Sequence, residues 1–243
     1  MIDGSTANGS VITALSVLLI AYLVGSFPNA YFIVKRVTGE DITAHGSGNV
    51  GAMNVRRATG SWGLFVFAMA ADFIKGLGPV VAAKLVVTGA ATLLIRPWGA
   101  VLSSVSVEWW RDAVYYVPMA AVAGAVLGHN YSLWLGVAKK RFVRTGKGLA
   151  TGAGALLAYD WRYFVAVVVI GLTVIAITRY MMAGQVVASL TLPVTALVLR
   201  SPDWLFAAAM GLLVYSAHHR RFMGLLRGKE PKFYINDRQG PCG

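Results

Sequence analysis

The stretch VITALSVLLIAYLVGSFPNAYFIV, residues 11–34, decides the fold class of this chain. It carries no charged side chain, and Gly25-Ser26 and Pro28 interrupt its apolar run. About 20 apolar residues in a helix span the hydrocarbon core of a bilayer, so the stretch predicts a transmembrane helix. Residues 1–10 contain no Lys or Arg, whereas a cleaved signal peptide starts with basic residues. We therefore expect a first span that is retained.

The composition of the whole chain also favours a membrane protein. Of its 243 residues, 57% are hydrophobic and 13% are charged, and the mean hydropathy is +0.63. Soluble domains average about 25% charged residues, so this chain has too few polar side chains to cover a surface in water. We predict an all-α polytopic integral membrane protein, with residues 1–243 forming a single membrane-embedded domain.

Further apolar segments follow the first one. Charged or turn-forming residues separate them, and they are 61–95, 113–136, 149–159, 161–178, 182–199 and 203–217. We expect 61–95 to hold one span and a break between Asp72 and Pro79. Seven transmembrane helices are the expected total, because the charges of Asp160, Arg162 and Arg179 would be costly inside lipid. Five is the alternative, if 149–178 and 182–217 each form one long bent helix.

The basic residues are distributed asymmetrically. The net charge is +12, and most Lys and Arg lie in 35–60, 137–148 and 218–243. Cytoplasmic loops of membrane proteins carry the excess of Lys and Arg, so these segments should be cytoplasmic. The N-terminus is then outside and the C-terminus cytoplasmic. We expect polar sites carried by these segments to lie on the cytoplasmic face, and we expect no nucleic-acid partner.

The first candidate site is the loop GSGNVGAMNVRR, residues 46–57. Its glycines, Gly46, Gly48 and Gly51, allow the backbone to approach a ligand closely. Its polar side chains offer hydrogen bonds or forked positive charge suited to phosphate, and they are Ser47, Asn49, Asn54, Arg56 and Arg57. A flexible turn with arginines on lipid headgroups is the simpler alternative. The loop also matches G-x-G-x-x-G, but an apolar helix precedes it where a dinucleotide-binding fold needs a strand.

The second candidate site is Gly146-Lys147-Gly148, with Thr151 one turn into the helix predicted at 149–159. A helix N-terminus favours an anion, and the Lys147 ammonium adds a point charge. The pattern is not a P-loop, because Gly148 stands where that motif requires Ser or Thr. The simpler alternative for Lys147 is an interfacial lysine that extends toward water.

A third motif is Gly128-His129-Asn130, in the later half of the 113–136 segment. His129 is either part of a site or a histidine that packs between helices. Asp72 and Lys75 are spaced to share a helix face, where they would neutralise each other's charge. The basic tail begins with His218 and includes Arg221.

Nothing in the sequence favours a metal or another cofactor. The four histidines and the one cysteine, Cys242, lie far apart in the sequence apart from His218 and His219. Adjacent residues of a helix point in different directions. We therefore predict no metal site and no cofactor, and one cysteine excludes an intrachain disulfide.

Taken together, the motifs resemble the bacterial membrane acyl-phosphate:glycerol-3-phosphate acyltransferase family. The resemblance extends from about Ala21 to Lys232. It rests on an ordered set of motifs: Gly25-Ser26-x-Pro28, the loop 46–57, Asp72-x-x-Lys75-Gly76, Gly128-His129-Asn130, Gly146-Lys147-Gly148-x-Ala150-Thr151, Arg179-Tyr180 and the tail from His218 to Glu230-x-Lys232.

The resemblance implies a reaction and its substrates. The family moves a fatty acyl group from an acyl phosphate to the sn-1 hydroxyl of glycerol 3-phosphate, which gives lysophosphatidic acid and phosphate in the first acylation step of phospholipid synthesis. Acyl phosphate and glycerol 3-phosphate are then the substrates, and we expect no obligate protein partner. Because an acyl phosphate is already activated, positioning and electrostatic stabilisation would suffice.

The resemblance also implies roles for individual residues. Arg57 and Lys147 would bind the glycerol phosphate group, while Ser47 and Asn49 would line the acyl-phosphate pocket. His218 would hydrogen-bond near the acceptor. The proton of the acceptor hydroxyl would go to His129 or to the phosphate of the substrate itself. The expected substrate-binding residues are Gly46, Gly48, Asn49, Gly51, Asn54, Arg56, Asn130, Gly146, Gly148, Thr151, Gln185 and Arg221.

The chain departs from the family pattern at several positions. Met53 stands where Thr is usual, Thr145 where a glycine is usual and Ser132 where a proline is usual. The two serines that usually follow Arg-Tyr are lost at Met182 and Gln185, and an Asn of the tail is replaced by Arg221. The segment between Gly136 and Gly146 is longer and more basic than usual. A different phosphorylated polyol is therefore an alternative acceptor. A transporter of a phosphorylated solute and a non-catalytic lipid-binding protein are further alternatives.

Overall fold

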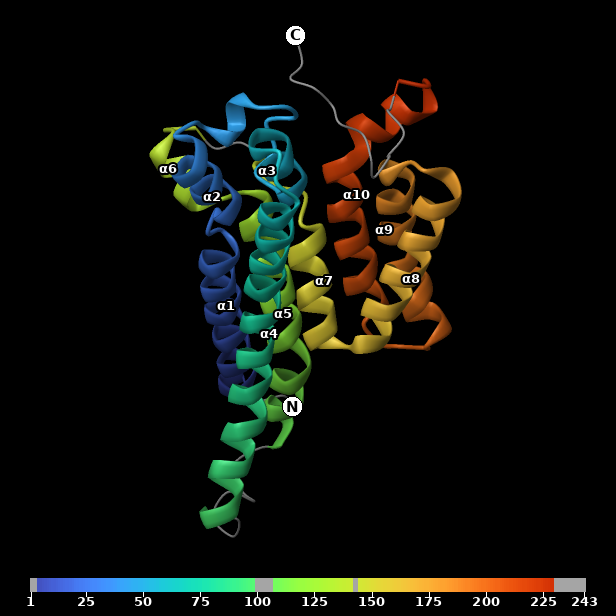
Figure 1. Ribbon diagram of the computed structural model, residues 1–243. Coiled ribbons are helices and arrows are strands. Elements are labelled where there is room, and N and C mark those ends of the chain that lie inside the picture. The colour runs from blue at the N-terminus through green and yellow to red at the C-terminus, as the bar shows by residue number, and fades with distance from the viewer. Residues whose placement is uncertain (1–3, 99–106, 142–143, 230–243) are drawn as a thin grey trace. The chain divides into compact units, whose positions relative to one another are not determined.

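The computed structural model describes residues 4–98, 107–141 and 144–229, and within them the chain is helical without a strand (Figure 1). Its elements are α1 (Gly4–Gly25), α2 (Asn29–Thr38), the 3₁₀ helix η1 (Ile42–Ala44), α3 (Ala52–Thr59), α4 (Trp62–Trp98), α5 (Val107–Asn130), α6 (Leu133–Ala138), α7 (Leu149–Tyr159), α8 (Trp161–Thr178), α9 (Met181–Val198) and α10 (Trp204–Leu226). The chain divides into two compact units, Met1–Phe164 and Val165–Gly243. The single-domain organisation stays a prediction.

Several helices are suited to a bilayer by length and composition. In the described part of the chain four segments are long and apolar enough to cross it, namely Gly9–Thr38, Trp62–Gly89, Trp161–Thr178 and Met181–Val198. Leu149–Tyr159 is a shorter apolar helix. The predicted segments 149–159 and 161–178 coincide with α7 and α8, and α9 begins one residue before its predicted start.

The predicted first span falls within the candidate segment Gly9–Thr38, whereas the break predicted in the second span was wrong. Residues 11–34 form two helices rather than one, because α1 ends at Gly25 and α2 begins at Asn29. Pro28 has no N–H group for a helical hydrogen bond, and it stands at the N-cap of α2. The break expected between Asp72 and Pro79 is absent, since α4 is one continuous helix. A proline removes one backbone hydrogen bond, but in apolar surroundings the other backbone groups have no better partner than the helix.

The predicted loops contain more structure than the sequence indicated. Segment 35–60 holds the end of α2, η1 and α3. The span predicted at 113–136 ends at Asn130, and α6 starts at Leu133 with Ser132 as its N-cap. The segment predicted as a tail from residue 218 is helical as far as Leu226. The mixed segment 96–112 lies partly outside the described residues, and Lys232 and Cys242 lie wholly outside them.

Glycines let the long helices of the first unit approach each other closely. A β-carbon at Gly128 would lie 2.2 Å from the carbonyl oxygen of Tyr22, and one at Gly124 would lie 2.3 Å from that of Leu18. The backbones of α1 and α5 are therefore in direct contact. Small residues at such positions are how membrane helices gain packing where the hydrophobic effect does not drive association. At Gly154, α7 meets α4 in the same way.

The second unit repeats this packing between α8, α9 and α10. A β-carbon at Gly184 of α9 would lie 2.6 Å from the carbonyl oxygen of Gly171 in α8, and one at Gly211 of α10 would lie 2.6 Å from that of Ser189 in α9. Arg179 has φ +59°, an unusual left-handed conformation for a residue other than glycine, and it separates α8 from α9.

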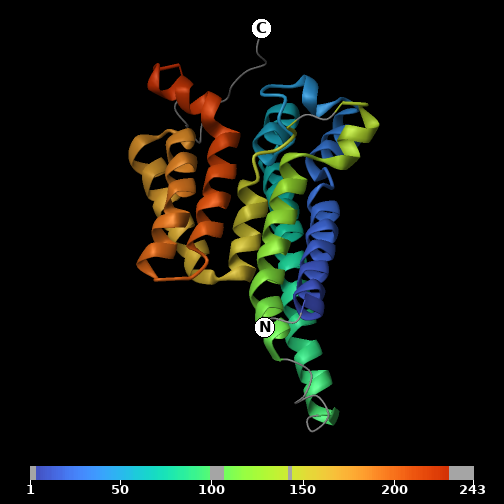
Figure 2. The ribbon, with the colours of Figure 1, turned by 180° about the vertical axis from the view of Figure 1, so that it is seen from behind.

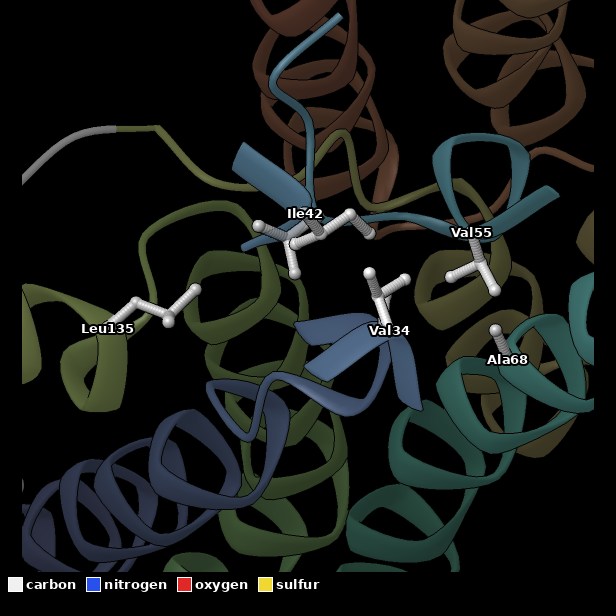
Figure 3. Close-up of a cluster of buried hydrophobic side chains, with 7 residues drawn as sticks. Val34, Ile42, Val55, Ala68 and Leu135 are labelled. Atoms are coloured by element: carbon white, nitrogen blue, oxygen red, sulfur yellow. The ribbon is translucent and has the colours of Figure 1, made fainter. Parts of the chain in front are cut away.

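The short elements α2, η1, α3 and α6 gather at one end of α1, α4 and α5, as the two opposite views show (Figures 1 and 2). Buried apolar side chains from these elements, from the loop that precedes α3 and from α4 form a cluster (Figure 3), which consists of Ala30, Val34, Ile42, Val50, Val55, Ala68 and Leu135. These residues come from elements far apart in the sequence. The cluster therefore fixes the loop 42–57 on the helices beneath it.

An ionic contact holds the same loop from its other side. Nζ of Lys139, just after α6, lies 2.7 Å from Oδ2 of Asp41 and also donates to the hydroxyl of Thr43. Oδ1 of Asp41 accepts hydrogen bonds from the backbone N–H and the hydroxyl of Thr43. Partial burial alone raises the pKa of Asp41, but the Lys139 and Thr43 hydrogen bonds and the Lys139 charge outweigh it and lower that pKa.

The close contact between α7 and α4 predicts that one of two neighbouring substitutions lowers the unfolding temperature and the other does not. Gly154→Ala should lower the unfolding temperature, because its β-carbon would lie 2.0 Å from the carbonyl oxygen of Phe73 and overpacking costs about 1–3 kcal/mol. Gly152→Ala is the matched control, since its β-carbon would meet only a side-chain methyl at 3.8 Å. Thermal unfolding in detergent should show no loss for Gly152→Ala. Equal losses in both variants would contradict the contact.

The lowered pKa of Asp41 predicts a pH-dependent contribution to stability. A carboxylate whose pKa is lower in the folded than in the unfolded state stabilises the fold above its ordinary value of about 3.9 and loses that contribution as the pH falls through the folded value. Asp41→Asn should lower the unfolding temperature by about 1–3 °C at pH 7, and the difference from the unsubstituted protein should vanish toward pH 3. Lys139→Met should behave alike, and a difference that persists at pH 3 would contradict the pairing.

Candidate functional site

The glycine-rich turn of the first candidate site follows η1. Gly48 has φ +66°, a left-handed conformation that favours glycine, and its N–H donates to the carbonyl oxygen of His45. Ser47 is exposed on this turn, and the amide of Asn49 lies against Gly51. The turn therefore combines short polar side chains with backbone that carries no side chain at its glycines.

Asn54 supports this turn from below. Its side-chain amide is buried and donates to the carbonyl oxygens of Ile42 and His45, each at 3.0 Å. A β-carbon at Gly46 would lie 2.6 Å from Oδ1 of Asn54. These contacts give Asn54 a structural role in the turn, while its predicted contact with substrate stays a prediction.

The two arginines of α3 have different surroundings. The guanidinium of Arg56 stacks over the ring of Trp62, 3.6 Å from its centroid, which is a cation–π contact. Arg57 is exposed, and its Cδ would lie 3.0 Å from a β-carbon at Gly46. Of the two, Arg57 is the one that lies beside the glycine-rich turn.

The second candidate site adjoins the first. The backbone N–H of Val50 donates to the carbonyl oxygen of Thr145 at 2.7 Å, so the turn 46–51 and the segment 145–148 are directly hydrogen-bonded. Thr145 in turn donates its backbone N–H to the carbonyl oxygen of Asn130, at the end of α5. The structure thus brings together three motifs that are far apart in the sequence.

The second site includes the N-terminus of α7. Gly148 is its N-cap, with φ +74°, and the first backbone N–H groups of a helix have no partner within it. The side chain of Asn130 is fully buried, with Oδ1 2.9 Å from where a β-carbon of Gly148 would stand. Neither polar atom of the Asn130 side chain forms a hydrogen bond with any of the described residues. The buried hydroxyl of Thr151 also has no hydrogen-bond partner among them. Buried polar groups are nearly always paired, so these atoms indicate a place for a polar ligand.

His129 joins this site to a buried polar group. Its ring packs against Gly146, where a β-carbon would lie 2.3 Å from Nε2. On its other side, Nδ1 lies 3.8 Å from Oδ1 of Asp72. Asp72 also pairs with Lys75 at 2.8 Å and accepts a hydrogen bond from the amide of Asn29 at 3.1 Å. Asn29 was missed by the sequence analysis, although a polar side chain inside an apolar stretch is the signal that would have found it.

Three predicted site residues belong to the second unit. His218 is buried in α10, and its Nδ1 donates to the carbonyl oxygen of Val214 at 2.7 Å. Gln185 lies in α9, where its Oε1 has no hydrogen-bond partner among the described residues. Arg221 lies in α10, one helical turn after His218. Their contribution to the site stays a prediction.

Two departures from the family pattern have a structural explanation. Ser132, which replaces a proline, donates to the carbonyl oxygen of Ser26 and accepts the N–H of Leu135 as the N-cap of α6. Thr145, which replaces a glycine, accepts the N–H of Ser132 through its hydroxyl. Both residues therefore connect the site segments to each other. In the described part of the chain no group of three metal-ligating side chains occurs.

The chain is similar to known proteins over most of its length. Residues 15–228 match the family model described as glycerol-3-phosphate acyltransferase. A glycerol-3-phosphate acyltransferase of Thermus thermophilus is 38% identical over 219 residues, which cover 89% of this chain and 94% of the relative. A glycerol-3-phosphate acyltransferase of Nostoc sp. is 34% identical, with 89% and 90% covered.

Solved structures resemble the whole fold. The crystal structure of PlsY (YgiH), an integral membrane glycerol 3-phosphate acyltransferase, in its glycerol 3-phosphate form, matches with a TM-score of 0.69 and 26% identity. The match covers 91% of this chain and 96% of that one. Its lysophosphatidic acid form matches with a TM-score of 0.67. A helical membrane fold, two adjoining glycine-rich turns and relatives at this level of identity lead to one conclusion: the chain belongs to the glycerol-3-phosphate acyltransferase family.

Proposed function

We propose that this chain transfers a fatty acyl group from an acyl phosphate to the sn-1 hydroxyl of glycerol 3-phosphate, giving lysophosphatidic acid and phosphate. The observation that carries the proposal is the hydrogen bond between Val50 and Thr145, because it places the two glycine-rich turns side by side. A transfer between two phosphorylated substrates needs two adjoining phosphate sites. The relatives named glycerol-3-phosphate acyltransferase support the same reaction.

The chemistry requires positioning more than a covalent nucleophile. The hydroxyl oxygen of the acceptor attacks the carbonyl carbon of the acyl phosphate, the bond from that carbon to the phosphate oxygen breaks, and phosphate leaves with the bonding electrons. An acyl phosphate already carries a good leaving group. Holding the hydroxyl oxygen of the acceptor beside the carbonyl carbon and stabilising the developing oxyanion account for the catalysis.

In this proposal each turn has its own task. Ser47 and Asn49 hold the acyl phosphate and polarise its carbonyl group, with Gly46, Gly48 and Gly51 giving the backbone access. Arg57 and Lys147 bind the phosphate of the acceptor. The backbone at Gly146 and Gly148, together with Asn130 and Thr151, completes the pocket at the N-terminus of α7. Both unpaired side chains, Asn130 and Thr151, then gain partners from the ligand.

The proton of the acceptor hydroxyl has two candidate acceptors, His129 and the phosphate of the acceptor itself. His218 hydrogen-bonds the acceptor through Nε2, since its Nδ1 is engaged with Val214. A neutral imidazole that donates through Nδ1 accepts through Nε2. No cofactor, metal or obligate protein partner enters this scheme.

The proposed topology has seven spans, an outer N-terminus and a cytoplasmic C-terminus. The support is that α1 with α2, α4, α5, α7, α8, α9 and α10 are separate helices, with breaks at Asp160 and Arg179 where charge would be costly in lipid. The basic segment 35–60 and the described residues 137–141 and 144–148 of the other basic segment lie at one end of the first unit. The active site is then on the cytoplasmic face of a bacterial membrane.

A different phosphorylated polyol is the second candidate acceptor. It is favoured by one observation: Met182 is buried and the nearby Gln185 carries an unpaired oxygen, where the family usually has serines. Either acceptor keeps the phosphate-binding part of the site.

The reaction is tested directly with the purified protein in detergent or a lipid mesophase. With palmitoyl phosphate and glycerol 3-phosphate we expect release of phosphate and formation of lysophosphatidic acid. Lys147→Ala should reduce kcat/KM by about 100-fold, as expected for a lost contact to a charged group. Lys140→Ala, an exposed lysine of the same segment, is the control. Activity only with another polyol phosphate would replace the proposed acceptor, and full activity of Lys147→Ala would remove that residue from the site.

The backbone of the first turn is tested by a pair of glycine substitutions. Gly48→Ala and Gly60→Ala both place alanine at a left-handed φ, of +66° and +70°, which costs about 1–2 kcal/mol in each. Gly60 has open space around it and ends α3. At equal loss of stability we expect Gly48→Ala alone to lose most of its activity, because only Gly48 approaches substrate. Equal activity in the two variants would favour a flexible turn without a ligand.

A further inference from the structure

Asp72 lies close to polar side chains from three elements of the first unit. Its Oδ1 lies 2.8 Å from Nζ of Lys75 in α4, 3.1 Å from the amide of Asn29 in α2 and 3.8 Å from Nδ1 of His129 in α5. Asp72 itself is 2% exposed. Neutralising Lys75 requires only the pair within α4. That role does not account for the proximity of Asp72 to Asn29 in α2 and to His129 in α5.

The group is also anchored to the break between α1 and α2. Nζ of Lys75 donates to the carbonyl oxygen of Phe27 at 2.9 Å, a carbonyl left outside the helices by the break. Asn29 starts α2 directly afterwards. The position of the Asp72 carboxylate is therefore fixed from two sides, and the third side faces His129.

The ring of His129 lies between Asp72 and the second glycine-rich turn. Its Nδ1 has no hydrogen-bond partner among the described residues, and the nearest acidic group is Asp72. The opposite edge of the ring lies against Gly146, so closely that a β-carbon there would be 2.3 Å from Nε2. A shift of this ring would therefore change the space available to the backbone at Gly146.

We propose that Asp72 is a positioning residue, which holds the ring of His129 against Gly146 and so shapes the pocket for the phosphate of the acceptor. The inference rests on the proposed function, since it assigns that phosphate to the Gly146–Gly148 turn. It predicts a selective effect: loss of Asp72 weakens binding of the acceptor and leaves the acyl donor unaffected. A role in packing alone would instead reduce the amount of active protein without changing either KM.

Steady-state kinetics separate these two roles. In Asp72→Asn we expect the KM for glycerol 3-phosphate to rise at least about tenfold, with the KM for palmitoyl phosphate within about twofold of that of the unsubstituted protein. Asp160→Asn is the matched control, because Asp160 also pairs with a neighbouring basic residue, Arg162, but at the far end of α7. A fall in kcat with both KM values unchanged would overturn the inference.

Asp72→Asn leaves the buried ammonium of Lys75 without its counter-ion, which by itself destabilises a protein. The double variant Asp72→Asn with Lys75→Met removes both charges and keeps the comparison valid if the single variant does not fold. We expect it to show the same selective rise in the KM for glycerol 3-phosphate. A normal KM in this folded double variant would also overturn the inference.

A double-mutant cycle tests whether Asp72 acts through His129. If it does, Asp72→Asn combined with His129→Gln should raise the KM for glycerol 3-phosphate no further than the larger single effect. Residues that act on one another in this way give non-additive changes. If the KM of the double variant rises by the product of the two single increases, the two residues act independently and the inference is contradicted.

A readout that needs no catalysis distinguishes this inference from the proposed function. With ¹⁵N-labelled histidine, the resonance of Nδ1 of His129, assigned by its absence in His129→Gln, should shift in Asp72→Asn and not in Asp160→Asn. This shift is expected even if the protein acylates another acceptor. An unchanged resonance in Asp72→Asn would show that the two side chains do not interact.

Discussion

Direct contact between helix backbones is the constraint on which the rest of the first unit depends. At Gly124 and Gly128 the backbone of α5 touches that of α1, and at Gly154 that of α7 touches α4. Helices in lipid gain little from the hydrophobic effect on association, so close packing must supply the stability. Such contacts also fix how far each helix is shifted along its neighbour. In the same unit, Oδ1 of Asp72 in α4 lies 3.8 Å from Nδ1 of His129 in α5.

The register has a chemical consequence at the end of the helices. Because α5 ends at Asn130 beside the start of α7, a fully buried amide lies next to a helix N-terminus. Burying polar atoms without a partner costs free energy, and within the described part of the chain the side chains of Asn130 and Thr151 have buried polar atoms of this kind. Sites that bind a polar ligand are where such unpaired groups are expected, since the ligand completes them.

Much of this arrangement could be predicted from the sequence, and the exceptions have physical reasons. The helices 149–159 and 161–178 were predicted to the residue because a charged residue or a turn ends each one. The break at Pro28 was underestimated and the break near Pro79 was predicted wrongly. A proline has the same local effect at both positions, but whether a helix continues depends on what surrounds it. Asn29 was missed because its partner, Asp72, lies 43 positions away.

The sequence by itself determined that the protein is a helical membrane protein, because apolar composition and segment length follow directly from the thickness of a bilayer. It also determined which residue types can bind phosphate, since glycine, lysine and arginine bring that chemistry wherever they stand. Only the tertiary structure decided that the turns at 46–51 and 145–148 adjoin, that Arg56 stacks on Trp62 while Arg57 lies by the turn, and that Asp72 faces His129. These are contacts between distant segments, and no local pattern encodes how two helices pack.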